Sequence, residues 1–210
     1  MMSENPQSHS PDQHLSSYPS FTIGERFRIL APEDQAPRDE RINLILAKGA
    51  FGSGEHETSA SCLEILEELP QVRNARVLDL GSGTGILALA ALKLGAASAV
   101  CIDINPAAVR TCERNCALNG LSGRVRNITG SLESLGEGDF DLVLANIYGD
   151  LLIDFAPGLV ERTRTGGLLL LSGILWAYNY DVRSGYERLG CKVLKNHMLE
   201  EFSTVLLQKG

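Results

Sequence analysis

The chain has 210 residues, of which 44% are hydrophobic, and a formal net charge of −7. These values suit one globular domain with a short appendage, and the acidic balance argues against a broad nucleic-acid-binding surface, which would need a basic excess. There is no apolar run near about 18 residues and no signal peptide, so we expect a cytoplasmic protein without membrane contact.

The N-terminal part divides into two zones. Residues 1–20 are polar and rich in Ser, Pro, Gln and His, which predicts a disordered tail. Residues 21–54 are expected to hold lead-in strands and a linker, with one strand over 21–30 and another over 41–46. From 55 to 210, strands alternate with helices, as in a doubly wound sheet.

A glycine-rich turn of sequence V-L-D-L-G-S-G-T-G occupies residues 77–85, after a short apolar run that suits a buried strand. Gly81, Gly83 and Gly85 let the chain turn sharply and bring bare backbone against a ligand. The glycine spacing differs from the dinucleotide fingerprint G-x-G-x-x-G. The sequence contains no G-x-x-x-x-G-K-[ST] phosphate-binding loop, and no basic residue near the turn is available to contact a phosphate. The turn therefore favours binding of an adenosine compound such as S-adenosylmethionine. The alternative interpretation is a tight strand-to-helix turn that binds no ligand.

Acidic residues end the two strands beside this turn. A helix is expected over 86–94, and the next apolar run, 99–102, closes on Asp103, which can accept the hydroxyls of a ribose or cap a helix. Asp79 can meet the ammonium of the cofactor, directly or through water, or bond the turn's own amides. Ile104 is expected to flank the adenine.

The remaining segments predict the second half of the sheet. Helices are expected over 106–119 (with Asn105 as a cap), 151–162 and 176–189, and strands over 124–128, 140–145, 168–172, 191–196 and 203–208. The last two strands have no helix between them, so they should form a hairpin with an antiparallel last strand. The predicted fold class is α/β, a doubly wound, seven-stranded, mostly parallel sheet with an antiparallel C-terminal hairpin.

The five cysteines, Cys62, Cys101, Cys112, Cys116 and Cys191, are odd in number and match no zinc spacing. We therefore expect reduced, structural thiols and no bound metal. No internal repeat is visible along the chain.

Several motifs resemble one family of class I, Rossmann-like methyltransferases. The matching segments are F-G-S-G-E-H-E-T-S at 51–59, I-D-I-N at 102–105, A-N-I at 145–147 and L-S-G-I-L at 171–175. They are similar to those of the PrmA-type ribosomal-protein lysine methyltransferases, from about residue 26 to the C-terminus. The first segment is the specific one, because general methyltransferases lack it. This chain departs from the family pattern at Glu57, usually proline, and at Ser59, usually threonine.

The resemblance implies a protein-lysine N-methyltransferase that uses S-adenosylmethionine. Asn146 and Tyr148 are the catalytic candidates, since the Asn146 carboxamide can accept a hydrogen bond from an incoming amine at the sheet rim. Thr58 and Ser59 resemble cofactor-contacting hydroxyls, or else only begin a helix. The cofactor-binding candidates are Thr58, Ser59, Asp79, Gly81, Ser82, Gly83, Gly85, Asp103, Ile104 and Asn146.

Other interpretations stay open. PrmA proteins carry an N-terminal recognition domain, for which the polar residues 1–20 offer no match, so the acceptor can be a ribosomal protein, another lysine-bearing protein or a small amine. A noncatalytic methyltransferase-like binding domain is a further alternative. His56 is interpreted as structural rather than as a base, and Trp176 and Tyr178 as walls of a lysine pocket or as core. The sequence gives no oligomeric state.

Overall fold

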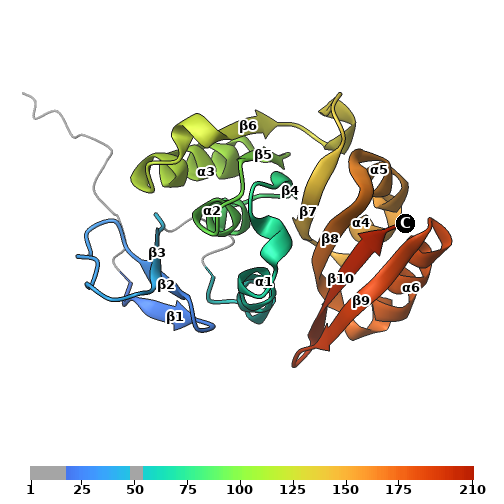
Figure 1. Cartoon of the computed structure of the whole chain (residues 1–210), viewed down its shortest axis with the longest axis horizontal. Coiled ribbons are helices and arrows are strands. Elements are labelled where there is room, and N and C mark those ends of the chain that lie inside the picture. The colour runs from blue at the N-terminus through green and yellow to red at the C-terminus, as the bar shows by residue number, and fades with distance from the viewer. Residues whose placement is uncertain (1–17, 48–53) are drawn as a thin grey trace, which may run out of the picture.

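The computed structural model describes residues 18–47 and 54–210, which build a large sheet and a small one (Figure 1). The large sheet has the order β6-β5-β4-β7-β8-β10-β9. Its strands are β4 (Arg76–Leu80), β5 (Ser98–Asp103), β6 (Val125–Thr129), β7 (Phe140–Asn146), β8 (Thr163–Leu175), β9 (Cys191–Met198) and β10 (Phe202–Lys209). Only β10 is antiparallel to its neighbours β8 and β9, which confirms the predicted fold class and the C-terminal hairpin.

Helices cover both faces of this sheet. They are α1 (Glu57–Glu67), α2 (Ile86–Lys93), α3 (Pro106–Leu118), α4 (Gly149–Asp154), α5 (Ala156–Arg162) and α6 (Trp176–Arg188), with short 3-10 helices at Pro70–Val72, Ser122–Arg124 and Leu132–Ser134. Alternate residues of a strand face opposite sides: Val77 packs with α1, α2 and α3, whereas Leu78 packs with α4, α5 and α6. The large sheet is therefore the middle layer of three.

The small sheet has the order β1-β2-β3, with β1 (Phe21–Ile23) antiparallel and β3 (Ile42–Ile45) parallel to β2 (Phe27–Leu30). It lies beside α1 and α2, at the opposite end of the molecule from β9 (Figure 1). Its apolar side chains join the core under α2. The small sheet is thus packed against the larger one through shared core residues.

Two predicted N-terminal boundaries need correction. The strand expected over 21–30 is two strands, because the chain reverses after Gly24, whose φ is +55°. Tyr18, within the predicted tail, is buried, and its hydroxyl donates to the carbonyls of Leu30 and Leu46 at 3.0 and 2.8 Å. The packed chain therefore begins no later than Tyr18, while residues 1–17 of that tail lie outside the described part.

Two predicted elements of the C-terminal half also differ. The helix expected over 151–162 is split into α4 and α5 at Phe155, because Pro157 lacks the N–H that would continue the first helix. The strand expected over 168–172 extends over Thr163–Leu175 and pairs with both β7 and β10. Within the two described ranges, no helix has both the length and the apolar character needed to span a membrane.

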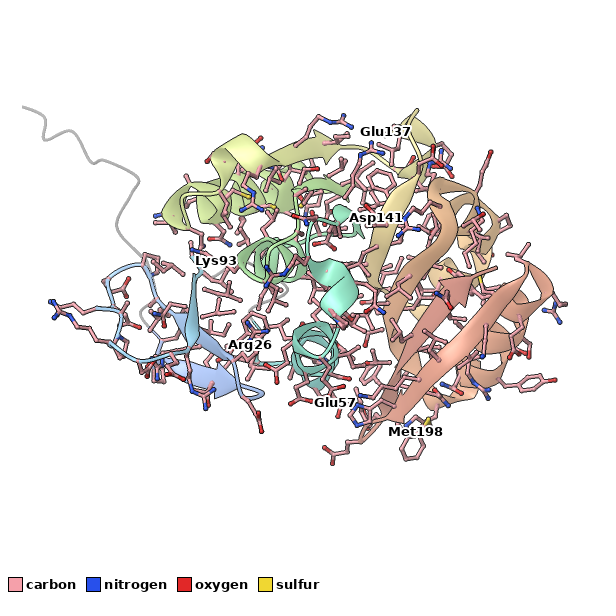
Figure 2. The ribbon with its side chains drawn as sticks, viewed as in Figure 1. Arg26, Glu57, Lys93, Glu137, Asp141 and Met198 are labelled. Atoms are coloured by element: carbon pink, nitrogen blue, oxygen red, sulfur yellow. The ribbon has the colours of Figure 1, made fainter. Side chains whose placement is uncertain are left out.

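Ion pairs gather at the amino-terminal ends of β4 and β7. Glu137 pairs with Arg76 and Arg126, while Asp141 pairs with Arg164 and accepts the backbone N–H of Arg76 at 2.7 Å. Glu137 and Asp141 both lie in the upper part of the view, near β7 (Figure 2). This charged cluster braces the rim opposite to the one that holds the candidate site.

Candidate functional site

The carboxyl ends of neighbouring parallel strands form the rim where the predicted residues meet. The registers align Leu80 of β4 with Ile102 of β5 and with Ala145 of β7. The next residues along these strands are Gly81, Asp103 and Asn146. The chain order reverses between β4 and β7, and open α/β sheets bind ligands outside the strand ends at such a point.

The glycine turn begins directly after β4. Gly81, Gly83 and Gly85 have φ values of +69°, +55° and +79°, in the left-handed region that favours glycine. A Cβ on Gly81 would lie 2.4 Å from Cγ2 of Ile147, so the turn also packs closely on the chain after β7. The Ser82 hydroxyl in this turn is buried and has no hydrogen-bond partner among the described residues.

Asp103, at the end of β5, braces the turn from the side. Its carboxylate accepts the backbone N–H of Gly83 at 3.0 Å and that of Asn105 at 2.9 Å. Asn105 in turn caps α3 by accepting the N–H of Ala107 at 2.9 Å, which confirms the predicted cap. Asp103 is partly exposed at the rim, where the ribose-binding role stays a prediction.

Asp79 lies under the turn and is 2% exposed. Its carboxylate accepts the N–H of Ala88, in the first turn of α2, at 3.2 Å. Burial raises the pKa of Asp79 to about 7, against the lowering effect of the Ala88 N–H and with a further rise from the charge of Asp103. The acid therefore bonds the helix that follows the turn rather than the amides of the turn, and contact with a cofactor ammonium stays a prediction.

Asn146 links the sheet rim to α1. Its side-chain Nδ2 donates to Oγ of Ser59 at 3.2 Å, and Ser59 is itself buried. In the part of the chain that the structure describes, its Oδ1 accepts no hydrogen bond. The structure thus joins two residues that are 87 positions apart in the chain and that sequence reasoning placed in the site separately.

The start of α1 is capped by His56. Its Nδ1 accepts the backbone N–H of Thr58 at 3.3 Å and lies 2.9 Å from Oγ1 of the same residue. The His56 ring also stacks edge-on against Phe202, with ring centroids 5.2 Å apart. These contacts support the structural interpretation of His56. Phe51 to Ser53, at the beginning of the same motif, lie outside the described residues.

Glu57, the residue that replaces the family's usual proline, holds the β9–β10 hairpin. Its carboxylate accepts the backbone N–H groups of Glu200 and Glu201 at 3.0 and 3.3 Å. Although burial acts in the opposite direction, these two N–H groups and that of Phe202 lower the pKa of Glu57. Glu57 and Met198 lie together at the tip of the hairpin (Figure 2).

The remaining predicted residues are exposed around this rim. Ile104 is 77% exposed, Tyr148 is 71% exposed and begins α4, and Trp176 is 54% exposed. The indole N–H of Trp176 donates to the carbonyl of Phe202 at 3.0 Å, and Tyr178 packs against Gly149. Trp176 and Tyr178 are therefore surface residues near the rim and not core.

Sequence reasoning missed some residues that shape the site. A Cβ on Gly173 would lie 2.4 Å from the carbonyl oxygen of Ile147 and 3.2 Å from Oδ1 of Asn146, and its φ is +78°. A glycine directly after the strand predicted over 168–172 was the available signal, because a glycine in a strand often marks a close approach of another backbone. Asn115 of α3 donates a hydrogen bond to the Thr84 carbonyl in the glycine turn, and no sequence pattern indicated this contact.

All five cysteines are buried and free. Burial raises the pKa of Cys62 to about 12, partly offset by a hydrogen bond with Ser172. Thiols with raised pKa values are poor nucleophiles. These findings agree with structural thiols, and their reduced state stays a prediction.

Comparison with known proteins adds to this geometry. A family model described as ribosomal protein L11 methyltransferase (PrmA) matches residues 10–210. A ribosomal protein L11 methyltransferase of Trichlorobacter lovleyi is 44% identical over 174 residues, which cover 80% of this chain and 57% of that protein. The corresponding protein of Myxococcus xanthus is 36% identical over 99% of this chain and 72% of its own length. The chain spans 51–57% of the first three curated relatives that it matches.

Solved structures show the same fold. A ribosomal protein L11 methylase of Lactobacillus delbrueckii subsp. bulgaricus superposes with a TM-score of 0.83 at 27% identity, covering 93% of this chain and 100% of that one. A 16S rRNA methyltransferase of T. thermophilus, in complex with AdoMet and guanosine, gives a TM-score of 0.62 at 24% identity over 76% of this chain and 45% of that one. The second likeness shows the fold alone.

Proposed function

Because the chain belongs to the ribosomal protein L11 methyltransferase (PrmA) family, we propose that it transfers a methyl group from S-adenosylmethionine to a lysine side chain of a protein. The observation that carries the proposal is the meeting of Gly81, Asp103 and Asn146 at the carboxyl ends of adjacent strands. When bound, S-adenosylmethionine supplies a methyl group on a cationic sulfonium that is an excellent leaving group.

The residues at the rim fit this cofactor. Gly81 and Gly83 of the turn carry no side chain and are half-buried at the rim. The buried Ser82 hydroxyl, which has no partner among the described residues, suits a polar group of the ligand. Asp103 is an acid at the end of the second strand, the position that holds ribose hydroxyls in related sheets. Thr58, Ser59 and Ile104 complete the proposed cofactor site.

Asn146 orients the methyl acceptor in this proposal. Because its Nδ2 is engaged by Ser59, its Oδ1 faces the rim as an acceptor for an amine N–H. An amine that donates one N–H to Oδ1 would point its lone pair away from Asn146 and toward the methyl group. Tyr148, the other catalytic candidate, lies two residues further along the same rim. Before such a transfer, the amine would have to give its proton to solvent.

No dedicated base is required. A lysine with a solution pKa near 10.4 needs roughly 4.6 kcal/mol to be neutral at pH 7. Alignment of two reactants can contribute about 7–11 kcal/mol, which exceeds that requirement. We therefore assign positioning roles to the rim residues, and we assign His56 to the cap of α1.

Ribosomal protein L11, which the names of the relatives contain, is the first acceptor to test. The chain should be incubated with S-adenosylmethionine that is labelled on the methyl group and with purified L11, and the product mapped by mass spectrometry. Label on a lysine of L11 would support the proposal. A parallel reaction with a cell lysate detects a different protein acceptor, and label that appears only in small molecules would favour a small amine.

Two further outcomes identify other functions. Cofactor binding without transfer to any acceptor would favour a noncatalytic binding domain. A rise in melting temperature with NAD but not with S-adenosylmethionine would favour a nicotinamide enzyme, for which the glycine spacing is wrong. The cytoplasmic location expected from composition stays a prediction.

A further inference from the structure

A buried amide connects the glycine turn to the small sheet. Asn115 of α3 is 0% exposed, its Nδ2 donates to the carbonyl of Thr84 at 2.9 Å, and its Oδ1 accepts the N–H of Ala47 at 2.8 Å. Thr84 lies within the turn, and Ala47 follows β3. One side chain thus bonds two backbone segments that are distant in sequence.

Asn119, one helical turn later, bonds the edge of the same sheet. Its amide accepts the N–H of Ile45 at 3.1 Å and donates to the carbonyl of Ile45 at 2.7 Å, as a neighbouring strand would. The Asn119 amide also donates to the carbonyl of Asn115 at 2.8 Å, and Nζ of Lys93 donates to the backbone carbonyl of Asn119 at 3.2 Å. Lys93 lies between α2 and the small sheet (Figure 2).

The turn packs closely against α3. A Cβ on Gly85 would lie 2.4 Å from Sγ of Cys112, and Thr84 is buried. Cys112 and Asn115 are three residues apart and therefore lie on one face of α3. On this face of α3, the Cys112 thiol packs against the turn and the Asn115 amide donates a hydrogen bond to it.

We propose that Asn115 is a positioning residue for cofactor binding, which sets the glycine turn through the Thr84 carbonyl and ties it to the small sheet through Ala47. The inference rests on the proposed function, because the turn is assigned there to S-adenosylmethionine. The amide carries its donor and its acceptor on two separate atoms without charge, so it can bond two backbone segments at once. An apolar side chain at this position would leave the buried carbonyl of Thr84 and the N–H of Ala47 without these partners.

The test compares Asn115→Leu with Asn119→Leu. Both variants remove a similar amide from the same helix and both loosen the small sheet, but only the first removes the bond to Thr84. Asn115→Ser, whose hydroxyl is too short to reach both partners, replaces the first variant if it fails to fold. The measurements are the Kd for S-adenosylmethionine by calorimetry and the hydrogen exchange of residues 82–88 without ligand, at a temperature where each variant is folded.

We expect the Asn115 variant to raise the Kd about tenfold and Asn119→Leu to change it by less than about twofold. Exchange over 82–88 should rise only in the Asn115 variant. Equal effects of the two variants, or an unchanged Kd in a folded Asn115 variant, would overturn the inference. If the unaltered protein binds no S-adenosylmethionine, the proposed function fails, and selective exchange over 82–88 then still decides whether Asn115 holds the turn.

Discussion

The side-chain amide of Asn146 donates to the hydroxyl of Ser59 across 3.2 Å, so that the end of β7 and the first turn of α1 hold each other. The bond fixes which end of the carboxamide faces the rim. In the proposed function the oxygen is then available to an incoming amine, and its orientation depends on a residue 87 positions earlier in the chain.

Asn146→Ala should lower kcat on the order of 100-fold, because misplacement of a reactant by about 1 Å has effects of that size. The Kd for S-adenosylmethionine, measured by calorimetry, should change little. Ser59→Ala is the matched control, since it frees the amide without removing it, and a loss nearer tenfold is expected. A collapse of cofactor affinity in Asn146→Ala would instead make this residue a cofactor ligand.

Gly81→Ala should abolish most cofactor binding and lower the free energy of unfolding by about 1–2 kcal/mol, because a Cβ is disfavoured at positive φ. The added carbon would also meet Ile147 at 2.4 Å. Gly185→Ala is the control: this glycine lies in α6, has nothing within 4 Å of its Cβ position, and should gain about 0.5–1 kcal/mol. Urea unfolding and calorimetry measure both effects, and a Gly81 variant as stable as the unaltered protein would contradict the prediction.

Asp79 should make the protein less stable as the pH rises from about 4 to about 7. Its pKa is raised from 3.8 to about 7 in the folded state, first by burial, so the folded chain holds a proton that the unfolded chain has released in this range. The loss is at most about 4 kcal/mol, from a shift of about three pKa units at 1.36 kcal/mol each.

Asp79→Asn should remove this pH dependence while its oxygen still accepts the Ala88 N–H. Urea unfolding of both proteins at pH 5 and pH 7.5 gives the comparison. The stability of the variant relative to the unaltered protein should increase with pH. Parallel pH profiles for the two proteins would show that the carboxyl of Asp79 does not titrate in this range.

Glu57→Gln should weaken the attachment of the β9–β10 hairpin to α1. A neutral amide offers one acceptor oxygen in place of two charged ones, so we expect a loss of about 1 kcal/mol and a melting temperature lower by about 3 °C. Glu57→Pro restores the usual residue of the family at the first position of α1, where proline suits a helix start. It should leave the helix intact and lose both bonds to the hairpin.

Hydrogen exchange separates the two parts of this prediction. Amides of Glu200 and Glu201 should exchange faster in both Glu57 variants, while the amides of α1 stay protected. Unchanged exchange at the hairpin in Glu57→Pro would mean that the carboxylate does not hold it.

The N-terminal boundaries show where sequence reasoning failed. Residues 21–30 alternate in hydrophobicity, but Gly24 at φ +55° reverses the chain, and the amides of Glu25 and Arg26 bond the distant carboxylate of Glu67. Alternation indicates which side chains are buried and does not reveal a reversal that a residue of another element stabilises. Tyr18 was placed in the tail because its neighbours are polar, although its partners are carbonyls on β2 and after β3.

The sequence by itself determined the alternation of strands and helices from β4 onward, the glycine turn, and the acids and asparagine at or next to the ends of β4, β5 and β7. These features depend on local periodicity, on glycine at positive φ and on strand ends, which neighbouring residues specify. Only the tertiary structure decided which groups meet. Three sets of hydrogen bonds join residues that are 31 to 144 positions apart. They are the Asn146–Ser59 bond, the bonds from the hairpin backbone to Glu57 and the two bonds of Asn115 with the backbone. Such pairings arise from packing of the whole sheet and its helices, and no local pattern encodes them.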